Sequence, residues 1–195
     1  MRKLLGLLTC VAVLASCSKH GTTIAPKINF IFKFDSTQVR LNNLGQPAGV
    51  AAGHKAQSPK FNLMSAHYVE LDQNQFTAIG AGALLYKAPE TTAGGANAID
   101  FSKSTFAGEG QTFLSVPIGL ISPGTYNWLR VSLAYQNYNV IITVPGNSFS
   151  ATVASFIGFR SYIQSYKVKD STVTVNANRD QGYWAFEARD RKSVV

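Results

Sequence analysis

The chain has 195 residues, of which 46% are hydrophobic and 14% are charged, and its formal net charge is +8. This length suits a single domain with a substantial hydrophobic core. The basic residues are spread singly along the chain, whereas a nucleic-acid-binding protein needs them clustered on one surface. We therefore expect no nucleic-acid partner.

The first 16 residues have the order of a secretory signal: basic Arg2 and Lys3, then an apolar run, then small residues. The run is too short to cross a bilayer, which takes about 20 apolar residues. Its end, LASC at 14–17, resembles the bacterial lipobox. That resemblance implies that residues 1–16 are removed and that Cys17 becomes the lipidated first residue. The alternative is an ordinary secretory signal that is cleaved near Cys17.

Lipidation at Cys17 would leave the mature chain without a free thiol or a disulfide, since Cys10 departs with the signal. Acyl chains contribute roughly 0.8 kcal/mol per buried CH2, so they hold a domain durably at a membrane. The polar residues 17–26 then form a tether. Lys19 and His20 follow the cysteine, whereas the surface-export signals of Bacteroidota lipoproteins are typically acidic there. We expect a protein anchored in the outer membrane and facing the periplasm.

Residues 27–195 are predicted to form one all-β domain. KINFIFKF (27–34) alternates apolar and polar residues with the period of a half-buried strand, and turn residues such as SPGT and PGNS separate later runs of this kind. About eight or nine strands are expected, which is typical of an antiparallel β-sandwich, immunoglobulin-like or jelly-roll-like. Other predicted strands lie at 61–71, 83–87, 110–118, 126–135, 138–144, 149–168, 173–178 and 183–187.

The sequence also predicts one long loop, one irregularity in a strand and an unusual C-terminal end. APETTAGGANAID (88–100) is predicted as a loop, and Gly158 is predicted to mark a bulge or a kink. The final residues, ARDRKSVV, follow a strand without a closing turn. If the sheet needs another strand, the sequence is incomplete at its C-terminus.

No catalytic motif is present: the chain lacks a G-x-S-x-G elbow, an H-E-x-x-H pair and a phosphate-binding glycine loop. Glu70 and Asp72 lie two residues apart on a predicted strand and resemble half of a glycosidase site, which needs a second carboxylate at a defined distance. Solvated surface acids are the favoured interpretation of this pair. We predict a protein that is not an enzyme and carries no cofactor.

Two histidines offer a metal-binding alternative. His54 lies in a loop rich in glycine and alanine, and His67 lies on a mostly apolar strand face. Imidazole is a good ligand for both copper and zinc, so His54 and His67 would form a metal site if the fold placed their side chains close together. The favoured interpretation is one surface histidine and one hydrogen-bonded, half-buried histidine.

Aromatic residues give the candidate ligand-binding site. Tyr126, Trp128 and Arg130 share one predicted strand face, and Tyr183 with Trp184 forms a second group. Exposed aromatic rows of this kind stack on sugar rings or peptides. For Trp128 the favoured interpretation is packing in the core, which is the commoner place for tryptophan.

The segments KINFIFKFD, SAHYVEL, PGTYNWLRVSLAYQNY, ASFIGFRSYI and QGYWAFE together resemble an uncharacterised family of Bacteroidota lipoproteins. A weaker resemblance is to the MbnP-like, copper-associated β-sandwich proteins of the periplasm. The copper chemistry of that family relies on histidines, few of which are in favourable places here. The main hypothesis is a lipid-anchored, non-catalytic envelope protein that recognises a carbohydrate, a peptide or another envelope protein. The alternative is a periplasmic copper- or zinc-binding protein that uses His54 and His67.

Overall fold

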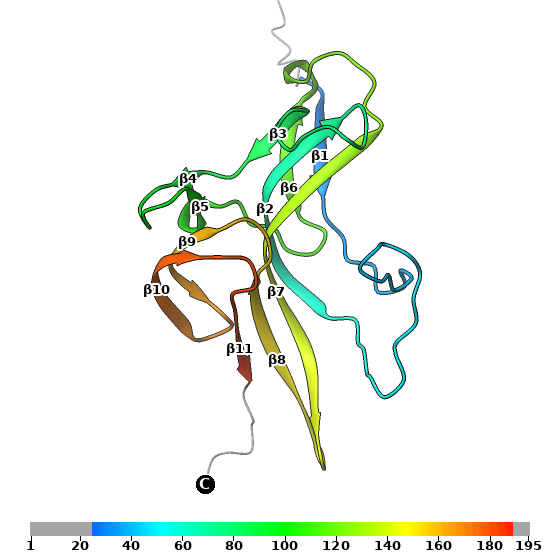
Figure 1. Cartoon of the computed structure of the whole chain (residues 1–195), viewed down its shortest axis with the longest axis vertical. Helices are drawn as coiled ribbons and strands as arrows, with labels where there is room; N and C mark the ends of the chain where they lie inside the picture. Colours follow the sequence, from blue (N-terminus) through cyan, green and yellow to red (C-terminus); the bar gives the residue numbers. More distant parts are fainter. Residues whose placement is uncertain (1–24, 189–195) are drawn as a thin grey trace, which may run out of the picture.

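The structure is a computed structural model that describes residues 25–188, and this part of the chain is all-β, as predicted (Figure 1). Its elements are β1 (Lys27–Ile31), β2 (Lys60–Asp72), β3 (Ala83–Lys87), β4 (Glu90–Thr91), β5 (Ala98–Asp100), the short 3-10 helix η1 (Phe101–Lys103), β6 (Thr112–Pro117), the 3-10 helix η2 (Ile118–Leu120), β7 (Trp128–Val144), β8 (Asn147–Phe156), β9 (Ser161–Lys167), β10 (Thr172–Arg179) and β11 (Trp184–Ala188).

The strands form three sheets. The largest has the order β11-β8-β7-β2-β3, and all its neighbours are antiparallel. A second sheet has the order β10-β9-β5-β4, with β5 and β9 parallel, and β1 pairs with β6 in a two-stranded ribbon. In Figure 1 the long β7-β8 hairpin reaches the lower end of the molecule, and β1 begins near the upper end.

The main core lies between the five-stranded and four-stranded sheets, in a sandwich-like arrangement. Tyr135, Ala154 and Phe156 of the first sheet pack against Ile163 and Tyr166 of the second. A separate core cluster joins the β1-β6 ribbon to the other end of the large sheet. The outer surface of β11, β8 and β7 is therefore left without a covering sheet in the described part of the chain.

The prediction of eight or nine strands was too low, because the described residues form eleven. The predicted loop 88–100 contains the short strands β4 and β5. Conversely, the two strands predicted on either side of Gln136 and Asn137 are one strand, β7. Asn137 is buried without breaking the strand because its side-chain amide donates to the carbonyl oxygen of Val168 at 2.7 Å.

Gly158 lies where the chain leaves β8 in the large sheet and enters β9 in the four-stranded sheet. A Cβ atom here would overlap the backbone carbonyl of Leu133. The kink predicted at this residue is thus a crossing between two sheets, and it needs a residue without a side chain.

The strict alternation predicted for 61–71 is wrong, because β2 contains register shifts between Phe61 and Leu63 and again between Ser65 and Tyr68. Such bulges add a residue to one strand and move the following side chains to the other face. Phe61 therefore lies on the outer face beside Tyr138, whereas Leu63 packs against the main core.

Several predictions concern residues outside the described range: the signal peptide, Cys17, most of the tether and the final residues 189–195. Within 25–188, none of the helices has the length and the apolar character that crossing a bilayer requires.

Candidate functional site

The predicted ligand-binding residues lie in two separate places. Trp128 begins β7, whereas Trp184 lies opposite Ser155 of β8, which in turn lies opposite Gln136 of β7. Residues 128 and 136 of an extended strand are separated by roughly 26 Å. Tyr126, Trp128 and Arg130 therefore cannot share one small ligand with Tyr183 and Trp184.

Arg130 is a structural residue rather than an exposed binding residue. Its guanidinium lies 2.6 Å from Glu70 and 3.4 Å from Asp72, and it also donates to the backbone oxygen of Thr77. Strand register causes this arrangement, since Glu70 lies directly opposite Arg130 on β2. The favoured interpretation of Glu70 and Asp72 as solvated acids is wrong, because both are fully buried.

Trp128 is 49% exposed, so packing in the core does not explain it. The neighbouring Tyr126 donates its hydroxyl to the backbone oxygen of Ser122 at 2.8 Å. Tyr126 also lines a shallow pocket of about 360 Å³ between the segments 73–83 and 122–126.

Tyr183 and Trp184 have different environments although they are adjacent. Tyr183 is half-buried, with its ring 5.7 Å from Phe156 and the guanidinium of Arg179 5.2 Å above it. Trp184 is 57% exposed and lies on the opposite face of β11. Only Trp184 of this pair is available to a ligand.

The exposed tryptophan belongs to a row of apolar side chains that crosses four strands of the large sheet on its outer face. Phe186 lies opposite Val153, which lies opposite Tyr138, which lies opposite Phe61. Residues directly opposite one another in an antiparallel pair point to the same side. The row, which we call the aromatic track, consists of Trp184, Phe186, Val153, Tyr138, Phe61 and Phe34.

Ring contacts join the aromatic members within each end of the track, and Val153 lies between the two ends. Trp184 and Phe186 are stacked, with centroids 5.9 Å apart and ring planes at 29°. At the other end Phe34 stacks on Phe61 at 3.5 Å, and Phe61 lies 5.6 Å from Tyr138. Three strand spacings give the track a length of roughly 14 Å.

Polar groups lie where the track ends at Phe34 and Phe61. These two rings help to line a pocket of about 260 Å³, together with the charged residues Lys33 and Asp35 and two serines, Ser36 and Ser58. A flat apolar platform that leads to a small polar pocket is a suitable surface for an extended ligand with ring faces and hydroxyl groups.

A different pocket, of about 380 Å³, is less suited to a ligand. It is lined in part by Asn62, Asn137 and Asn139. The Asn62 amide donates to the side-chain oxygens of Asn137 and Asn139 at 2.8 and 3.0 Å. These polar groups already hydrogen-bond one another and hold β2 against β7.

The two candidate metal ligands differ in environment. His54 is exposed in a turn of the segment that precedes β2. His67 is buried in β2, where its Nε2 lies 2.9 Å from Glu90 and its ring stacks on Phe159 at 5.1 Å. Within residues 25–188, no three His, Cys, Asp or Glu side chains lie close enough together to hold a metal ion.

His67 and Glu90 form a pH-sensitive pair. Burial lowers the pKa of His67 below its ordinary 6.5, against the opposing effect of Glu90. Burial also disfavours charge on Glu90, but hydrogen bonds from Asn97, His67 and Lys87 outweigh it and lower its pKa to about 2. Both groups therefore bind protons more readily in the unfolded chain, so acid favours unfolding.

We expect the melting temperature to be steady above pH 7 and to fall as the pH drops through 6.5, where unfolded His67 takes up a proton. A further fall is expected between pH 4.5 and 2 as Glu90 is protonated. Thermal unfolding from pH 8 to pH 2 measures both steps. His67→Gln should remove only the upper step, and His54→Gln, at an exposed position, is the matched control. An upper step that persists in His67→Gln contradicts the assignment.

Sequence reasoning found Trp184 but missed Phe34, Phe61, Tyr138 and Phe186. Phe186 carried a usable signal, because residues two apart on a strand share a face. The others depend on cross-strand register and on the bulge after Phe61, which the sequence pattern does not reveal. Comparison of the chain with protein-family models, curated proteins and solved structures gave no match.

Proposed function

We propose that this protein is a lipid-anchored, non-catalytic binding protein of the cell envelope that holds an extended carbohydrate on its aromatic track. The observation that carries the proposal is the exposed, stacked pair of Trp184 and Phe186. The anchor follows from the sequence around Cys17 alone, and with it the expected position at the periplasmic face of the outer membrane.

The chemistry of the track favours carbohydrate over a folded protein partner. A sugar ring has an apolar face of C–H bonds, which packs on an aromatic ring while its hydroxyl groups stay in water. Two neighbouring rings on one strand present a platform for successive sugar units. Hydroxyl groups at the far end would meet Lys33, Asp35 and the two serines of the polar pocket.

Binding of soluble polysaccharides, measured by affinity electrophoresis and then by calorimetry, tests the proposal. We expect Trp184→Ala to weaken binding at least about tenfold, which corresponds to about 1.4 kcal/mol, because stacking and buried apolar area are both lost. Phe186→Ala should have a similar effect, since its ring lies beside that of Trp184.

Trp128→Ala is the matched control, because this tryptophan is also about half exposed but lies at the other end of the sheet. It should leave polysaccharide binding unchanged. Loss of binding in Trp128→Ala with retention in Trp184→Ala would place the site elsewhere. Absence of binding to glucans, xylans, mannans and peptidoglycan fragments alike would overturn the carbohydrate assignment.

A further inference from the structure

We propose that one end of the domain, formed by the segments 73–82 and 118–129, lies in the interface of the bilayer to which Cys17 is attached. We call this region the apolar end. The inference rests on the proposed lipid anchor and adds a second membrane contact made by the folded domain itself.

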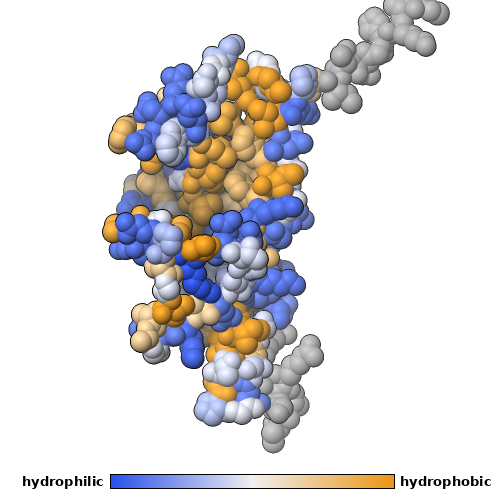
Figure 2. Space-filling view, turned by 90° about the vertical axis from the view of Figure 1, so that its right-hand side faces the viewer, coloured by the Kyte–Doolittle hydropathy of each residue, from blue (hydrophilic) through white to orange (hydrophobic). Residues whose placement is uncertain are grey.

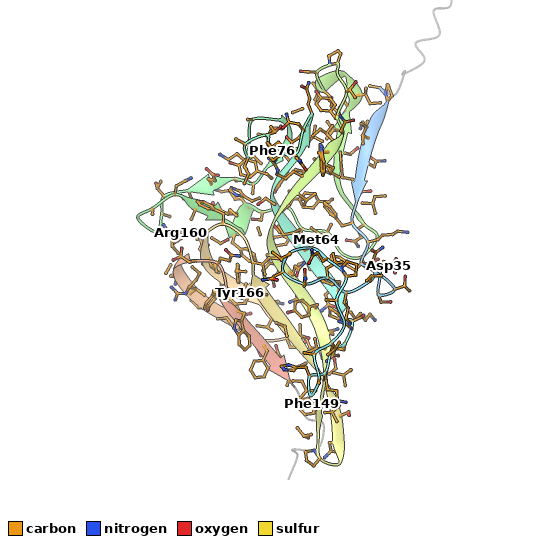
Figure 3. All side chains as sticks on the ribbon, turned by 45° about the vertical axis from the view of Figure 1, so that its right-hand side comes forward. Asp35, Met64, Phe76, Phe149, Arg160 and Tyr166 are labelled. Carbon is orange, nitrogen blue, oxygen red and sulfur yellow. The ribbon has the colours of Figure 1, made fainter. Side chains whose placement is uncertain are left out.

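The two segments are neighbours, and they lie where the described chain begins. The backbone N–H of Ile118 donates to the carbonyl oxygen of Pro26 at 2.9 Å. The backbone N–H of Asn127 donates to the backbone carbonyl oxygen of Asp72, the last residue of β2, at 3.1 Å. Both segments also line the pocket that contains Tyr126. In Figure 3, Phe76 lies in the upper half of the molecule, and Phe149 of the β7-β8 hairpin lies at the lower end.

Large apolar side chains are unusually exposed at the apolar end. Phe76 is 85% exposed and Leu120 is 78% exposed, and neither segment 73–82 nor segment 118–129 contains a charged residue. Figure 2 shows apolar side chains gathered in the upper half of one face, and Figure 3 places Phe76 in the same half. Exposed apolar side chains on neighbouring segments indicate a contact with a partner or a membrane. The remaining exposed apolar members are Ile79, Ile118, Trp128 and Leu129.

The position of the anchor identifies the bilayer as the partner. From Cys17 to Ala25, the first described residue, the chain advances eight residues, which span at most about 29 Å when extended. Lipidation would thus hold the apolar end close to the membrane, at a high effective concentration. Tryptophan prefers the membrane interface because its ring is apolar while its N–H stays hydrated. Exposed Lys27, at the start of β1, suits anionic headgroups.

The chain contains two tryptophans, Trp128 at the apolar end and Trp184 on the aromatic track, so fluorescence reports the two places separately. We would place the mature lipidated chain in phosphatidylethanolamine and phosphatidylglycerol vesicles with bromine on the acyl chains. Trp184→Phe leaves Trp128 as the probe, and Trp128→Phe leaves Trp184. We expect quenching about fivefold stronger for Trp128, because interfacial residues reach the acyl boundary.

The combined variant Phe76→Ser with Leu120→Ser should reduce the quenching of Trp128 to the level of Trp184. Both side chains are exposed, so the fold should tolerate the changes, and Ile141→Ser, exposed near the opposite end, is the matched control. Equal quenching of both tryptophans would overturn the proposed orientation.

Flotation of the vesicles separates the two proposals. A chain that floats with the vesicles but shows no quenching of Trp128 keeps its anchor and overturns the apolar end as a membrane contact. A chain that fails to float overturns the anchor and this inference with it. A chain that floats equally well as Cys17→Ser overturns the anchor alone, because the folded domain then binds the bilayer without a lipid.

Discussion

Replacing Arg130 with methionine should lower the free energy of unfolding by about 3–5 kcal/mol, the usual cost of removing one partner from a buried ion pair. Arg130 is the cation that compensates Glu70 and Asp72, both of which are fully buried. Methionine keeps much of the apolar stem of arginine, so the loss reports the charge rather than the volume. Denaturant titration followed by near-ultraviolet circular dichroism measures it.

A second substitution that removes a buried negative charge tests whether the loss of stability comes from the uncompensated carboxylates. Neither carboxylate oxygen of Asp72 has a hydrogen-bond partner, so Asp72→Asn in the Arg130→Met chain removes a buried charge and breaks no hydrogen bond. We expect the double variant to recover part of the lost stability. Arg160→Ala is the matched control, because its ion pair with Asp180 is solvent-exposed and should contribute less than about 1 kcal/mol. Equal losses in Arg130→Met and Arg160→Ala would contradict the role assigned to Arg130.

Period-2 alternation was sufficient to predict the class of this fold, because each strand buries one face and repeats that requirement along its length. It failed where tertiary hydrogen bonds override the local pattern. Gln136 and Asn137 look like a turn, yet the bond from Asn137 to Val168 lets β7 continue. β4 and β5 are too short to show a period, and β5 is held by parallel pairing with β9, far away in the chain.

The candidate site was only partly predictable, for a related reason. A tryptophan in a predicted strand is visible in the sequence, but its exposure and the row to which it belongs depend on neighbouring strands. Phe61 joins Tyr138 because a bulge shifts the register of β2, and Phe34 arrives from a segment outside the sheet. Arg130 was assigned to a ligand because strand alternation placed it on one face with Tyr126 and Trp128, whereas its partners on β2 are buried acids.

Gly158→Ala should be the second most damaging single change described here, with a loss of about 3 kcal/mol, because overpacking against a rigid element forces backbone shifts. The three atoms nearest to the new Cβ would all belong to the backbone: the carbonyl oxygen and carbon of Leu133 and the Cα of Ala134. These atoms belong to β7, the centre of the large sheet, which cannot move without disturbing β2 and β8. The hydrogen bond from Ile157 N–H to Ala134 O, 3.0 Å long, would be lost as the chains separate.

Substitutions at two other glycines test whether the loss of stability in Gly158→Ala comes from a steric clash or from an unfavourable backbone conformation. Gly49→Ala meets nothing within 4 Å, and its φ is not positive, so its effect should stay within about 0.5 kcal/mol. Gly146→Ala also has open space but sits at φ +79°, where a side chain should cost about 1–2 kcal/mol. Gly158 has no positive φ, so a loss larger than that of Gly146→Ala must come from contact with β7. A loss no larger than that of Gly49→Ala would show that the crossing from β8 to β9 relaxes freely, and that the two sheets are less firmly joined than their shared core implies.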